Sequence, residues 1–484
     1  MSTAVVCLEL TNPNPNPNPN PNPNPNPNPS SSPSPSPGPN PSPSPNPNQE
    51  IIDVAIIGSG PGGLGAALAL SPQNNNNCHG SVAVFERASA FRPIGAALGL
   101  NVLGYQALEE LGLAVRAARA PNPNPNPNPN SNPMNPNQDW VRSLAANPQW
   151  DVLLRPNGEV LYDDESFLKD TEFTWLGWYT LQSTLRERLR DLPEVSVNLR
   201  HRLVDFEEDE ENSLVRLRFQ VASEEGGEET EKIVLARVLV GADGYHSVIR
   251  RKTVNDGPPN YTGTMTWRGV LNRDQFRLQQ KNNNQPLGRP FHSDEHGNLN
   301  VYGDRKTFTV MDCGNGQIAW TGTALQESAH KSADAQEDAL KVFHNWPPVV
   351  KSLILGVDDP RDIVQSGVFD RDPVDSWGVS DGTFQRVTLL GDAAHAMRPS
   401  LGLGSTMALQ DALSLSKELS KVESLEDSKS VATALTAYES ERIGVTAPLQ
   451  LEARAQGNAQ HREDRADQMK QVLDSALAQK KGSA

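Results

Sequence analysis

The stretch IIDVAIIGSGPGGLGAALAL, residues 51–70, passes from an apolar segment through closely spaced glycines into a segment rich in alanine and leucine. Ile51 to Ile57 is apolar and partly β-branched, which predicts a strand buried on both faces of a parallel sheet. The residues from Gly65 to Leu70 are mostly good helix formers. The glycines therefore lie where a strand turns into a helix, as in an α/β fold.

Three of these glycines fit the pattern that binds a dinucleotide. Gly58 permits a tight turn, Gly60 lets the backbone approach a pyrophosphate, and Gly63 allows close packing of the helix. The amino terminus of that helix then faces the phosphates. A GxGxxG pattern is common by chance, but its place between this strand and this helix favours a dinucleotide site over a merely structural turn.

A second predicted strand, in SVAVFERAS, ends at Glu86. An acidic side chain here accepts hydrogen bonds from ribose hydroxyls and repels a 2′-phosphate. NADP is therefore disfavoured at this turn, whereas NAD and FAD both remain possible. The separation between Gly58 and Glu86 is longer than usual, which we explain by a polar loop extension at residues 73–77.

Two tracts of low complexity interrupt the chain of 484 residues. Residues 1–49 and 121–138 consist largely of Asn-Pro and Ser-Pro repeats, and they carry too few apolar side chains to join a core. We expect both tracts to be disordered spacers. A docking segment for a proline-binding partner is less favoured because the tracts show no obvious PxxP side-chain pattern. The remaining chain is long enough for two domains.

The overall charge and the cysteines narrow the class of protein further. With 43 basic and 59 acidic residues, the formal net charge is −16, so nucleic acid is not an expected partner. Cys7, Cys78 and Cys313 show neither metal-ligand spacing nor a disulfide framework. We expect no transmembrane segment and no secretory signal, and hence a cytoplasmic protein, with an organelle address and the oligomeric state left open.

Two later segments repeat the strand-then-turn design. ARVLVGADGYHSVIRR, residues 236–251, is an apolar strand whose turn carries Asp243. RVTLLGDAAHAMRPSLGLG, residues 386–404, predicts a strand over 386–390 followed by Asp392, with a helix over 406–419 further on. Ligands of open α/β sheets bind outside the carboxyl ends of the strands, so both aspartates are expected beside the ligand.

These three motifs, in this order, resemble those of the single-component flavin-dependent aromatic hydroxylases, whose relatives include salicylate, urate and zeaxanthin oxygenases. The resemblance extends from about residue 51 to about residue 454. It implies FAD as the cofactor, NAD(P)H as co-substrate, molecular oxygen, and an electron-rich aromatic or heteroaromatic small molecule as substrate. In this family, reduced nicotinamide reduces the flavin and one oxygen atom is then transferred to the substrate.

The resemblance also implies an architecture: a Rossmann-like FAD-binding domain of the glutathione-reductase type and an antiparallel-sheet substrate domain that covers the flavin. Alternating apolar and polar residues within 261–373 agree with such a sheet, and they predict one solvated face. The implied division is an FAD-binding domain at 50–148, 181–257 and 376–455, a crossing segment at 149–180, a substrate-binding domain at 258–375 and a helical tail at 456–484.

Site residues follow from the matching motifs. Gly58, Gly60 and Gly63 resemble the turn over the FAD pyrophosphate, and Glu86 resembles the ribose acceptor. Asp243 lies in a motif that the family links to FAD and reduced nicotinamide, and Asp392 matches the residue that binds the ribityl and ribose region. Pro399, Gly402 and Gly404 match the loop that lies against the pyrimidine ring of the flavin. Gln182 stands where many relatives carry an arginine. A glutamine donates hydrogen bonds but does not neutralise phosphate.

Arg268 is the candidate catalytic residue. It interrupts an apolar strand in TMTWRGVL that resembles the strand covering the flavin, and its guanidinium would pair with a carboxylate or an anionic ring oxygen of the substrate. A surface arginine on the wet face of the sheet is an equal alternative, because the sequence does not fix the parity of the strand.

Other residues in the motifs are interpreted as structural. His395, Tyr245 and His246 lie in the motif turns without a required role as general base, and Trp175 and Trp178 are more often core residues than pocket lining in such a strand. No protein nucleophile is needed. The alternative functions are epoxidation of a xanthophyll-like substrate, a flavin reductase or oxidase on the same fold, and a non-catalytic scaffold.

Deleting residues 1–49 tests the interpretation of the first tract. The shortened chain is expected to keep its folded yield, its flavin content and its turnover nearly unchanged, because the deleted residues lack the apolar side chains needed to stabilise a core. The measurement compares soluble yield and bound flavin of the two chains. A large loss of folded protein would show that the tract belongs to the structure.

Overall fold

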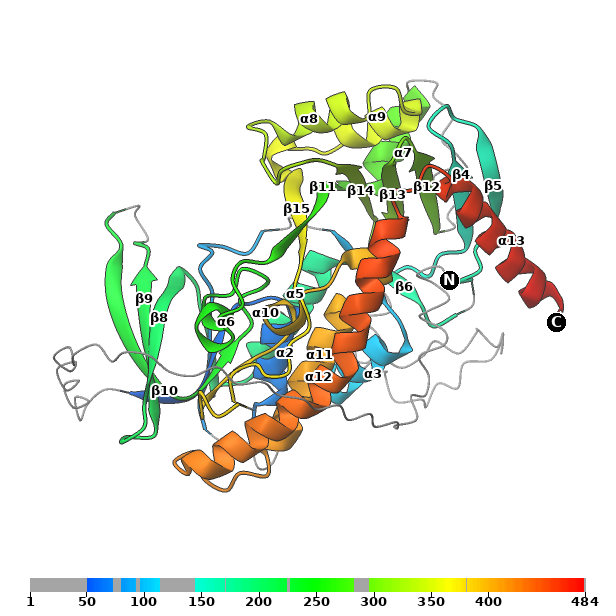
Figure 1. Cartoon of the computed structure of the whole chain (residues 1–484). Helices are drawn as coiled ribbons and strands as arrows, with labels where there is room; N and C mark the ends of the chain where they lie inside the picture. Colours follow the sequence, from blue (N-terminus) through cyan, green and yellow to red (C-terminus); the bar gives the residue numbers. More distant parts are fainter. Residues whose placement is uncertain are drawn as a thin grey trace, which may run out of the picture.

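The structure is a computed structural model that describes residues 50–72, 80–92, 96–113, 144–169, 171–223, 227–282, 296–379 and 381–482. The tracts at 1–49 and 121–138 and the loop at 73–77 lie outside the described residues. Figure 1 shows two sheet-containing domains, with the long helix α12 (Ser428–Ala459) running along the first domain towards the second.

The first domain is built on a mixed sheet in the strand order β7-β2-β1-β10-β9-β8, with β16 also paired to β10. Its strands are β1 (Ile51–Ile57), β2 (Val82–Phe85), β7 (Val195–Asn198), β8 (His201–Asp209), β9 (Leu214–Val221), β10 (Thr230–Gly241) and β16 (Val387–Leu389). The pairs β2–β7, β1–β2, β1–β10 and β10–β16 are parallel. Strand β9 pairs antiparallel with both β10 and β8, so the β8–β9 hairpin continues the sheet beyond β10.

The register of the parallel strands brings the predicted motifs together. Ile57 pairs with Phe85 on one side and with Gly241 on the other, and Gly241 pairs with Leu389. The strands therefore end at one edge of the sheet, and the turns that follow them lie next to one another there. This alignment is what the α/β interpretation of the sequence requires.

Helices cover this sheet and connect its strands (Figure 1). They are α2 (Pro61–Ala69), α3 (Val102–Glu110), α5 (Trp178–Leu189), α6 (Val248–Thr253), α10 (Asp392–His395), α11 (Gly404–Leu419) and α12, with the short 3-10 helix η3 (Pro399–Leu401) before α11. Helix α2 begins at Pro61, inside the glycine motif, because proline at the first helical position needs no hydrogen-bond acceptor for its nitrogen. A two-stranded ribbon, β3 (Ala97–Leu100) and β6 (Thr174–Gly177), lies between the domains.

The second domain contains a sheet in the order β15-β11-β14-β13-β12-β4-β5. Its strands are β4 (Trp150–Leu154), β5 (Val160–Glu165), β11 (Asn260–Asn272), β12 (Gly297–Gly303), β13 (Lys306–Asp312), β14 (Gln317–Leu325) and β15 (Val364–Asp370). The pairs are antiparallel except β4 with β12, which is parallel because β4 comes from the crossing segment rather than from a neighbouring hairpin. The Rossmann-like domain and the largely antiparallel sheet confirm the predicted fold class.

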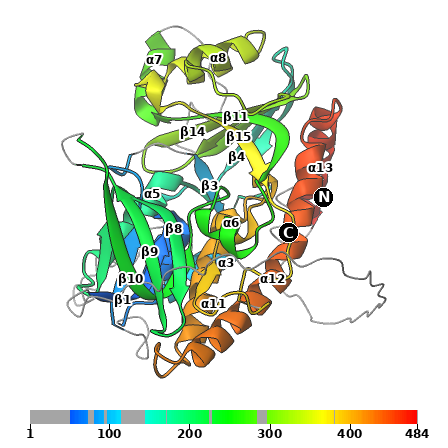
Figure 2. The same cartoon turned by 60° about the vertical axis from the view of Figure 1, so that its left-hand side comes forward.

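The prediction that one face of this sheet is exposed to solvent is wrong. One face packs against α8 (Ala335–Val342) and α9 (Pro348–Leu355) in an apolar core that includes Trp267, Trp320 and Phe343. Helix α7 (Arg273–Asn282) and the 3-10 helix η2 (Pro360–Asp362) complete this side of the domain. The other face is turned towards the first domain, as Figure 2 shows, so polar side chains on it face another part of the protein.

The carboxyl-terminal helices join the two domains. Helix α13 (Arg465–Gly482) packs Leu473 and Leu477 against Leu153 and Tyr162 of the second sheet. An ion-pair group adds to this connection: the carboxylate of the exposed Asp256 accepts from the buried Arg250 of α6 at 2.8 Å and from the buried Arg371, which follows β15, at 2.9 Å. The region predicted as a tail from residue 456 thus contains the end of α12 and the whole of α13.

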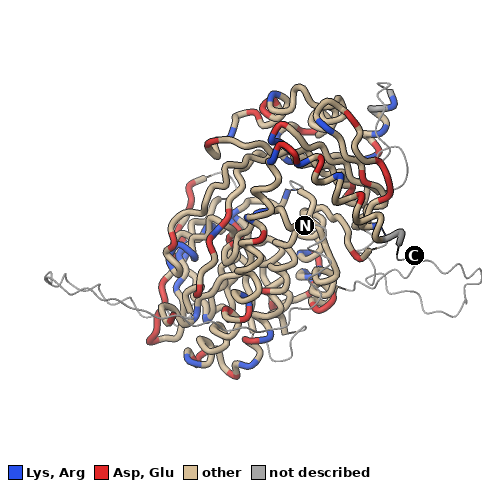
Figure 3. Tube along the Cα trace, turned by 45° about the vertical axis from the view of Figure 1, so that its right-hand side comes forward, with Lys and Arg blue, Asp and Glu red and all other residues tan. Residues whose placement is uncertain are grey.

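The described helices include none that is long and apolar enough to cross a bilayer. The positions of basic and acidic residues are interspersed along the described backbone, as Figure 3 shows.

Leu409 tests the packing of α11 against α2. Its side chain is fully buried in the main apolar core, so Leu409→Ala is expected to lower the free energy of unfolding by about 2–5 kcal/mol. Leu451→Ala on α12 is the matched control, because that leucine is 54% exposed and its loss should change stability by less than about 0.5 kcal/mol. Urea denaturation followed by circular dichroism measures both, and equal losses would contradict the assigned core.

Candidate functional site

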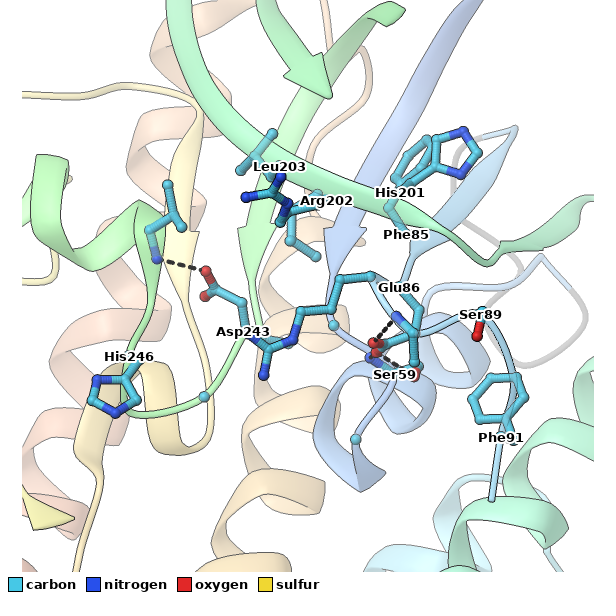
Figure 4. Close-up of a pocket in the computed structure, with 18 of the residues that line it drawn as sticks. Ser59, Phe85, Glu86, Ser89, Phe91, His201, Arg202, Leu203, Asp243 and His246 are labelled. Atoms are coloured by element: carbon cyan, nitrogen blue, oxygen red, sulfur yellow. Dashed lines mark hydrogen bonds between the residues drawn. The ribbon is translucent and has the colours of Figure 1, made fainter. Parts of the chain in front are cut away.

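A cavity of about 830 Å³ opens at the carboxyl edge of the first sheet. Five predicted site residues line it: Gly58, Gly60, Glu86, Gln182 and Asp243. They come from the turns after β1, β2 and β10 and from helix α5. Strands β2 and β10 flank β1, and Figure 4 shows Glu86 and Asp243 in the turns that follow them. Segments far apart in the chain thus meet at one site.

The three motif glycines are needed for different reasons. At Gly58, φ is +106° and an added Cβ would lie 2.3 Å from the carbonyl oxygen of Ala242, so the turn excludes any larger residue. At Gly63, an added Cβ would lie 2.1 Å from the carbonyl oxygen of Gly58. At Gly60, an added Cβ would meet no atom within 4 Å, because that residue faces the cavity. The backbone at Gly60 is therefore open to close approach by a bound group.

Glu86 and Gln182 hold the glycine turn from two sides. One carboxylate oxygen of Glu86 accepts hydrogen bonds from the backbone nitrogen of Ser59 at 3.1 Å and from its hydroxyl at 2.6 Å, while the other accepts from the nitrogen of Ala88 at 2.8 Å. The side-chain amide of Gln182 donates to the carbonyl oxygen of Ser59 at 2.9 Å. Gln182 thus fixes the turn in this structure, which is a role that needs no positive charge.

Asp243 follows β10 at the same edge. Its Oδ2 accepts a hydrogen bond from the backbone nitrogen of Val248 at 2.7 Å, which ties the carboxylate to the start of α6. Its Oδ1 is buried and has no hydrogen-bond partner among the described residues. Burial raises the pKa of Asp243. A buried acceptor without a partner, beside a cavity, suits a ligand that donates from hydroxyl groups.

The remaining predicted cofactor contacts lie on the loop between β16 and α11. Asp392 is the first residue of α10 and is exposed, Pro399 begins η3, and Gly404 begins α11. Gly402 adopts φ +67°, and added Cβ atoms at Gly402 and Gly404 would meet nothing within 4 Å. These residues do not line the described cavity, but they follow a strand that ends at the same sheet edge.

A buried charged group supports this loop, and sequence reasoning missed it. Oδ2 of Asp411 accepts from the backbone nitrogen of Gly391 at 2.8 Å and lies 2.6 Å from Nε2 of His395, while Oδ1 accepts from Nε of Arg442 at 2.7 Å. Burial opposes the charge, but the neighbouring His395 and Arg442 lower the pKa of Asp411 to about 2. His395 is only 1% exposed, so it supports the turn that carries Asp392.

Strand parity places Arg268 on the face of the second sheet that is turned towards the first domain. Its neighbour Trp267 points to the opposite side, where its Nε1 donates to Asp338 of α8 at 3.1 Å. Nη2 of Arg268 donates to Ser366 at 2.9 Å, and Nε is buried without a partner among the described residues. Burial lowers the pKa of Arg268, while the nearby Tyr245 raises it. The alternative, in which Arg268 is a surface arginine on a solvent-exposed face of the sheet, does not hold.

The interpretation of Trp175 and Trp178 as core residues is only partly right. Both are half-buried and pack against apolar clusters, but Trp178 also lines the cavity because it begins helix α5 beside the glycine turn. Tyr245 stacks on Phe369 of β15 with ring centroids 5.4 Å apart, and it thereby connects the two domains. His246 is exposed and lines the cavity.

Basic residues of the cavity were also missed by sequence reasoning. Arg87, Arg202 and Arg251 lie among its lining residues. Arg87 directly follows Glu86 and Arg251 ends the motif at 236–251, so these two positions are the sequence signals that could have identified members of the group. Arginine side chains in a cavity favour an anionic ligand such as a dinucleotide phosphate.

Comparison with known proteins identifies the family. A family model described as "FAD binding domain" matches residues 51–450, which is most of the chain. The chain therefore belongs to the FAD-dependent monooxygenases of the group A flavoprotein family, and FAD is its cofactor. The residues present fit that cofactor. The open backbone at Gly60, the Oδ1 of Asp243 that no described residue hydrogen-bonds, and the basic cavity suit a pyrophosphate joined to hydroxyl-bearing sugars.

Curated relatives include epoxidases and a monooxygenase/isomerase. A chloroplastic zeaxanthin epoxidase of Solanum lycopersicum is 31% identical over 271 residues, which are 54% of this chain and 35% of that protein. The aurachin C monooxygenase/isomerase of Stigmatella aurantiaca is 31% identical over 184 residues, covering 38% of this chain and 42% of that protein. The matched region thus spans about a third of the first relative and less than half of the second.

Solved structures share the fold. HpxO of Klebsiella pneumoniae, in complex with FAD and uric acid, superposes with a TM-score of 0.63 at 21% identity over 87% of this chain and 92% of that chain. A salicylate hydroxylase substrate complex gives a TM-score of 0.60 at 20% identity over 88% and 94%. At this level of identity, the likeness establishes the arrangement of the two domains.

Two glycine substitutions separate the binding role of the turn from its structural role. Gly60→Ala is expected to leave the FAD-free protein folded, because the new Cβ points into open space, but to weaken FAD binding about tenfold or more by entering the cavity. Gly63→Ala is expected to destabilise the fold itself, because its Cβ meets backbone oxygen. Thermal unfolding of the FAD-free proteins and flavin fluorescence titration give the two readouts. Unchanged FAD affinity in Gly60→Ala would remove Gly60 from the binding site.

Proposed function

We propose that the protein uses NAD(P)H and molecular oxygen to hydroxylate an electron-rich aromatic or heteroaromatic small molecule. The observation that carries the proposal is the convergence of the glycine turn, Glu86 and Asp243 at one sheet edge, opposite a second sheet that carries Arg268. When bound, FAD supplies the redox chemistry: it accepts a hydride from NAD(P)H and activates oxygen, of which one atom goes to the substrate and the other to water.

In this proposal, different residues of the first domain bind different parts of the cofactor. Gly58, Gly60 and Glu86 hold the pyrophosphate and the ribose, and Asp243 accepts from a cofactor hydroxyl. Asp392 binds the ribityl region. Pro399, Gly402 and Gly404 would hold the flavin ring, and the amino terminus of α11 would favour negative charge on it.

The second domain binds the substrate in this proposal. Arg268 pairs with a carboxylate or an anionic ring oxygen, which holds the ring in place and favours its ionised, more electron-rich form. Its Nε is buried and has no hydrogen-bond partner in the part of the chain that the structure describes, which supports this role because a guanidinium nitrogen in that state calls for an acceptor. The cover of the second sheet would also exclude water from the reacting groups.

Epoxidation of a xanthophyll-like substrate is the second candidate, and the identity to zeaxanthin epoxidases favours it. A flavin reductase or oxidase would consume NAD(P)H without an oxygenated product, and a scaffold would bind no stoichiometric FAD. A cytoplasmic location belongs to our proposal as well, although the zeaxanthin epoxidase relatives are chloroplastic. Imaging of a tagged full-length chain decides between the compartments.

The proposal predicts a yellow protein with one FAD per chain. With the correct aromatic substrate, oxygen uptake, NAD(P)H oxidation and hydroxylated product are expected in equal amounts. Asp392→Ala should retain less FAD, because a cofactor hydroxyl loses its charged acceptor. Absorbance spectra, an oxygen electrode and product analysis provide the measurements. A folded protein that binds no FAD would overturn the proposal, as would NAD(P)H oxidation that yields only peroxide with every substrate of a broad aromatic panel.

A further inference from the structure

One face of helix α5 carries a cation beside the cofactor cavity. Trp178, Gln182 and Arg186 follow one another at intervals of four residues, so they share one face of the helix. Trp178 and Gln182 line the cavity. Arg186 extends the same face by one more turn and adds a positive charge to it.

The side chain of Arg186 starts out in the direction of Gln182. In an α-helix the Cα–Cβ bonds tilt towards the amino terminus, so a long side chain covers the turn that precedes it. For Arg186 that turn contains Gln182, whose amide donates to the carbonyl oxygen of Ser59 in the glycine turn at 2.9 Å. This tilt takes the guanidinium towards the glycine turn rather than away from it.

Phe91 holds the guanidinium at the wall of the cavity. The central carbon of the Arg186 guanidinium lies 3.9 Å from the centroid of the Phe91 ring, which is a cation–π contact. Phe91 lines the cavity, and Figure 4 draws its ring among the lining residues. Arg186 does not line the cavity itself, so it lies one contact behind the wall.

The hydrogen-bonding capacity of Arg186 is not fully used. Its Nη1 is buried and has no partner in the part of the chain that the structure describes, and no described carboxylate forms an ion pair with this arginine. Arg188 on the same helix differs, because its Nη1 lies 3.8 Å from the carboxylate of Asp191. A buried guanidinium N–H without an acceptor calls for one, and an anionic oxygen is the best match.

A purely structural role explains less of this arrangement. Arg186 lies in the last turn of α5, where a cation interacts favourably with the carboxyl end of the helix. The strongest form of that interaction is a hydrogen bond to one of the last carbonyl groups, and Nη1 makes none among the described residues. An uncharged side chain of similar length would also pack on Phe91. The charge of Arg186 therefore needs a separate explanation.

The charge of Arg186 differs in its surroundings from the charges that line the cavity. Arg87, Arg202 and Arg251 are exposed, so water and salt screen them. Arg186 is half-buried and its Nη1 is fully covered, so its charge is screened less and acts more strongly on an anion in the cavity. The pyrophosphate of FAD is such an anion, and Gln182 brings no charge to it.

We propose that Arg186 is a cofactor-binding residue of this chain. Its guanidinium, held on the ring of Phe91, supplies the positive charge and the N–H donor for the pyrophosphate of FAD on the α5 side of the cavity. Gln182 and Arg186 then have complementary roles: the amide fixes the glycine turn, and the guanidinium neutralises the phosphate. This inference concerns the binding of FAD and does not depend on which substrate is oxygenated.

The test compares full-length variants that are prepared FAD-free and titrated with FAD by flavin fluorescence. Arg186→Met removes the charge but keeps an apolar side chain on Phe91, whereas Arg186→Lys keeps the charge. A double variant, Arg186→Met with Gln182→Arg, returns a guanidinium to the same helix face one turn earlier. Arg188→Met is the matched control, because Arg188 lies on the same helix and pairs with Asp191. Thermal unfolding of the FAD-free proteins measures any structural effect.

Arg186→Met is expected to weaken FAD binding about tenfold or more, because a charge-assisted contact to phosphate is lost. Added salt should weaken FAD binding less in this variant than in the unchanged protein, since one of the interactions that salt screens is missing. Arg186→Lys should bind FAD more tightly than Arg186→Met, and the added Gln182→Arg should recover part of the loss. Arg188→Met should bind FAD normally, and all FAD-free variants should unfold at nearly the same temperature.

Two results would overturn the inference. One is an FAD affinity that Arg186→Met leaves unchanged. The other is a weaker affinity that neither Arg186→Lys nor Gln182→Arg improves, because the positive charge would then not be the cause of the loss. Failure of the proposed hydroxylation leaves both readouts intact, since neither of them uses a substrate.

Discussion

The alignment of four parallel strand ends is the constraint on which the site depends. The backbone pairs of Ile57 with Phe85 and Gly241, and of Gly241 with Leu389, bring four turns to one level although they lie more than 300 residues apart at the extremes. Each turn then adds a group of a different kind: an open glycine backbone, a carboxylate that braces that backbone, a carboxylate with an unpaired oxygen, and the loop before α11. A slip of one residue in any pair would turn the side chains of that strand to the other face.

The sequence specifies this edge well because its signals are local. Strand β1 has the bounds expected from its apolar run, and the steric requirements at Gly58 and Gly63 follow from a strand that turns directly into a helix. The cofactor contacts assigned to Asp392, Pro399, Gly402 and Gly404 stay predictions. The bounds of the domains also stay predictions, although strands β4 and β5 of the crossing segment lie in the second sheet.

What the sequence does not specify depends on long-range pairing. The side to which Arg268 points follows only from the packing of Trp267 against α8, and the parallel pairing of β4 with β12 joins segments that have no local signal in common. The hydrogen bond from Gly391 to Asp411, and the ion pair of Asp411 with Arg442, likewise form only when helices α11 and α12 pack together. The prediction of a solvent-exposed face was wrong because alternating apolar and polar residues indicate only that the two faces of a sheet differ in environment. Here the more polar face is turned towards the first domain rather than towards solvent.

The short strand β16 has a consequence for the order of events during synthesis. It supplies the last of the aligned turns, and helix α11, which follows it, packs against α2 at the glycine motif through Leu409 and Gly65. A nascent chain that has emerged only as far as the second sheet therefore has a sheet edge without its final turn, and the apolar side of α2 still lacks the helix that buries it. Contacts of such high sequence separation form late and slow folding. The sheet edge and the burial of α2 are thus complete only when the chain as far as Leu419 is available to fold.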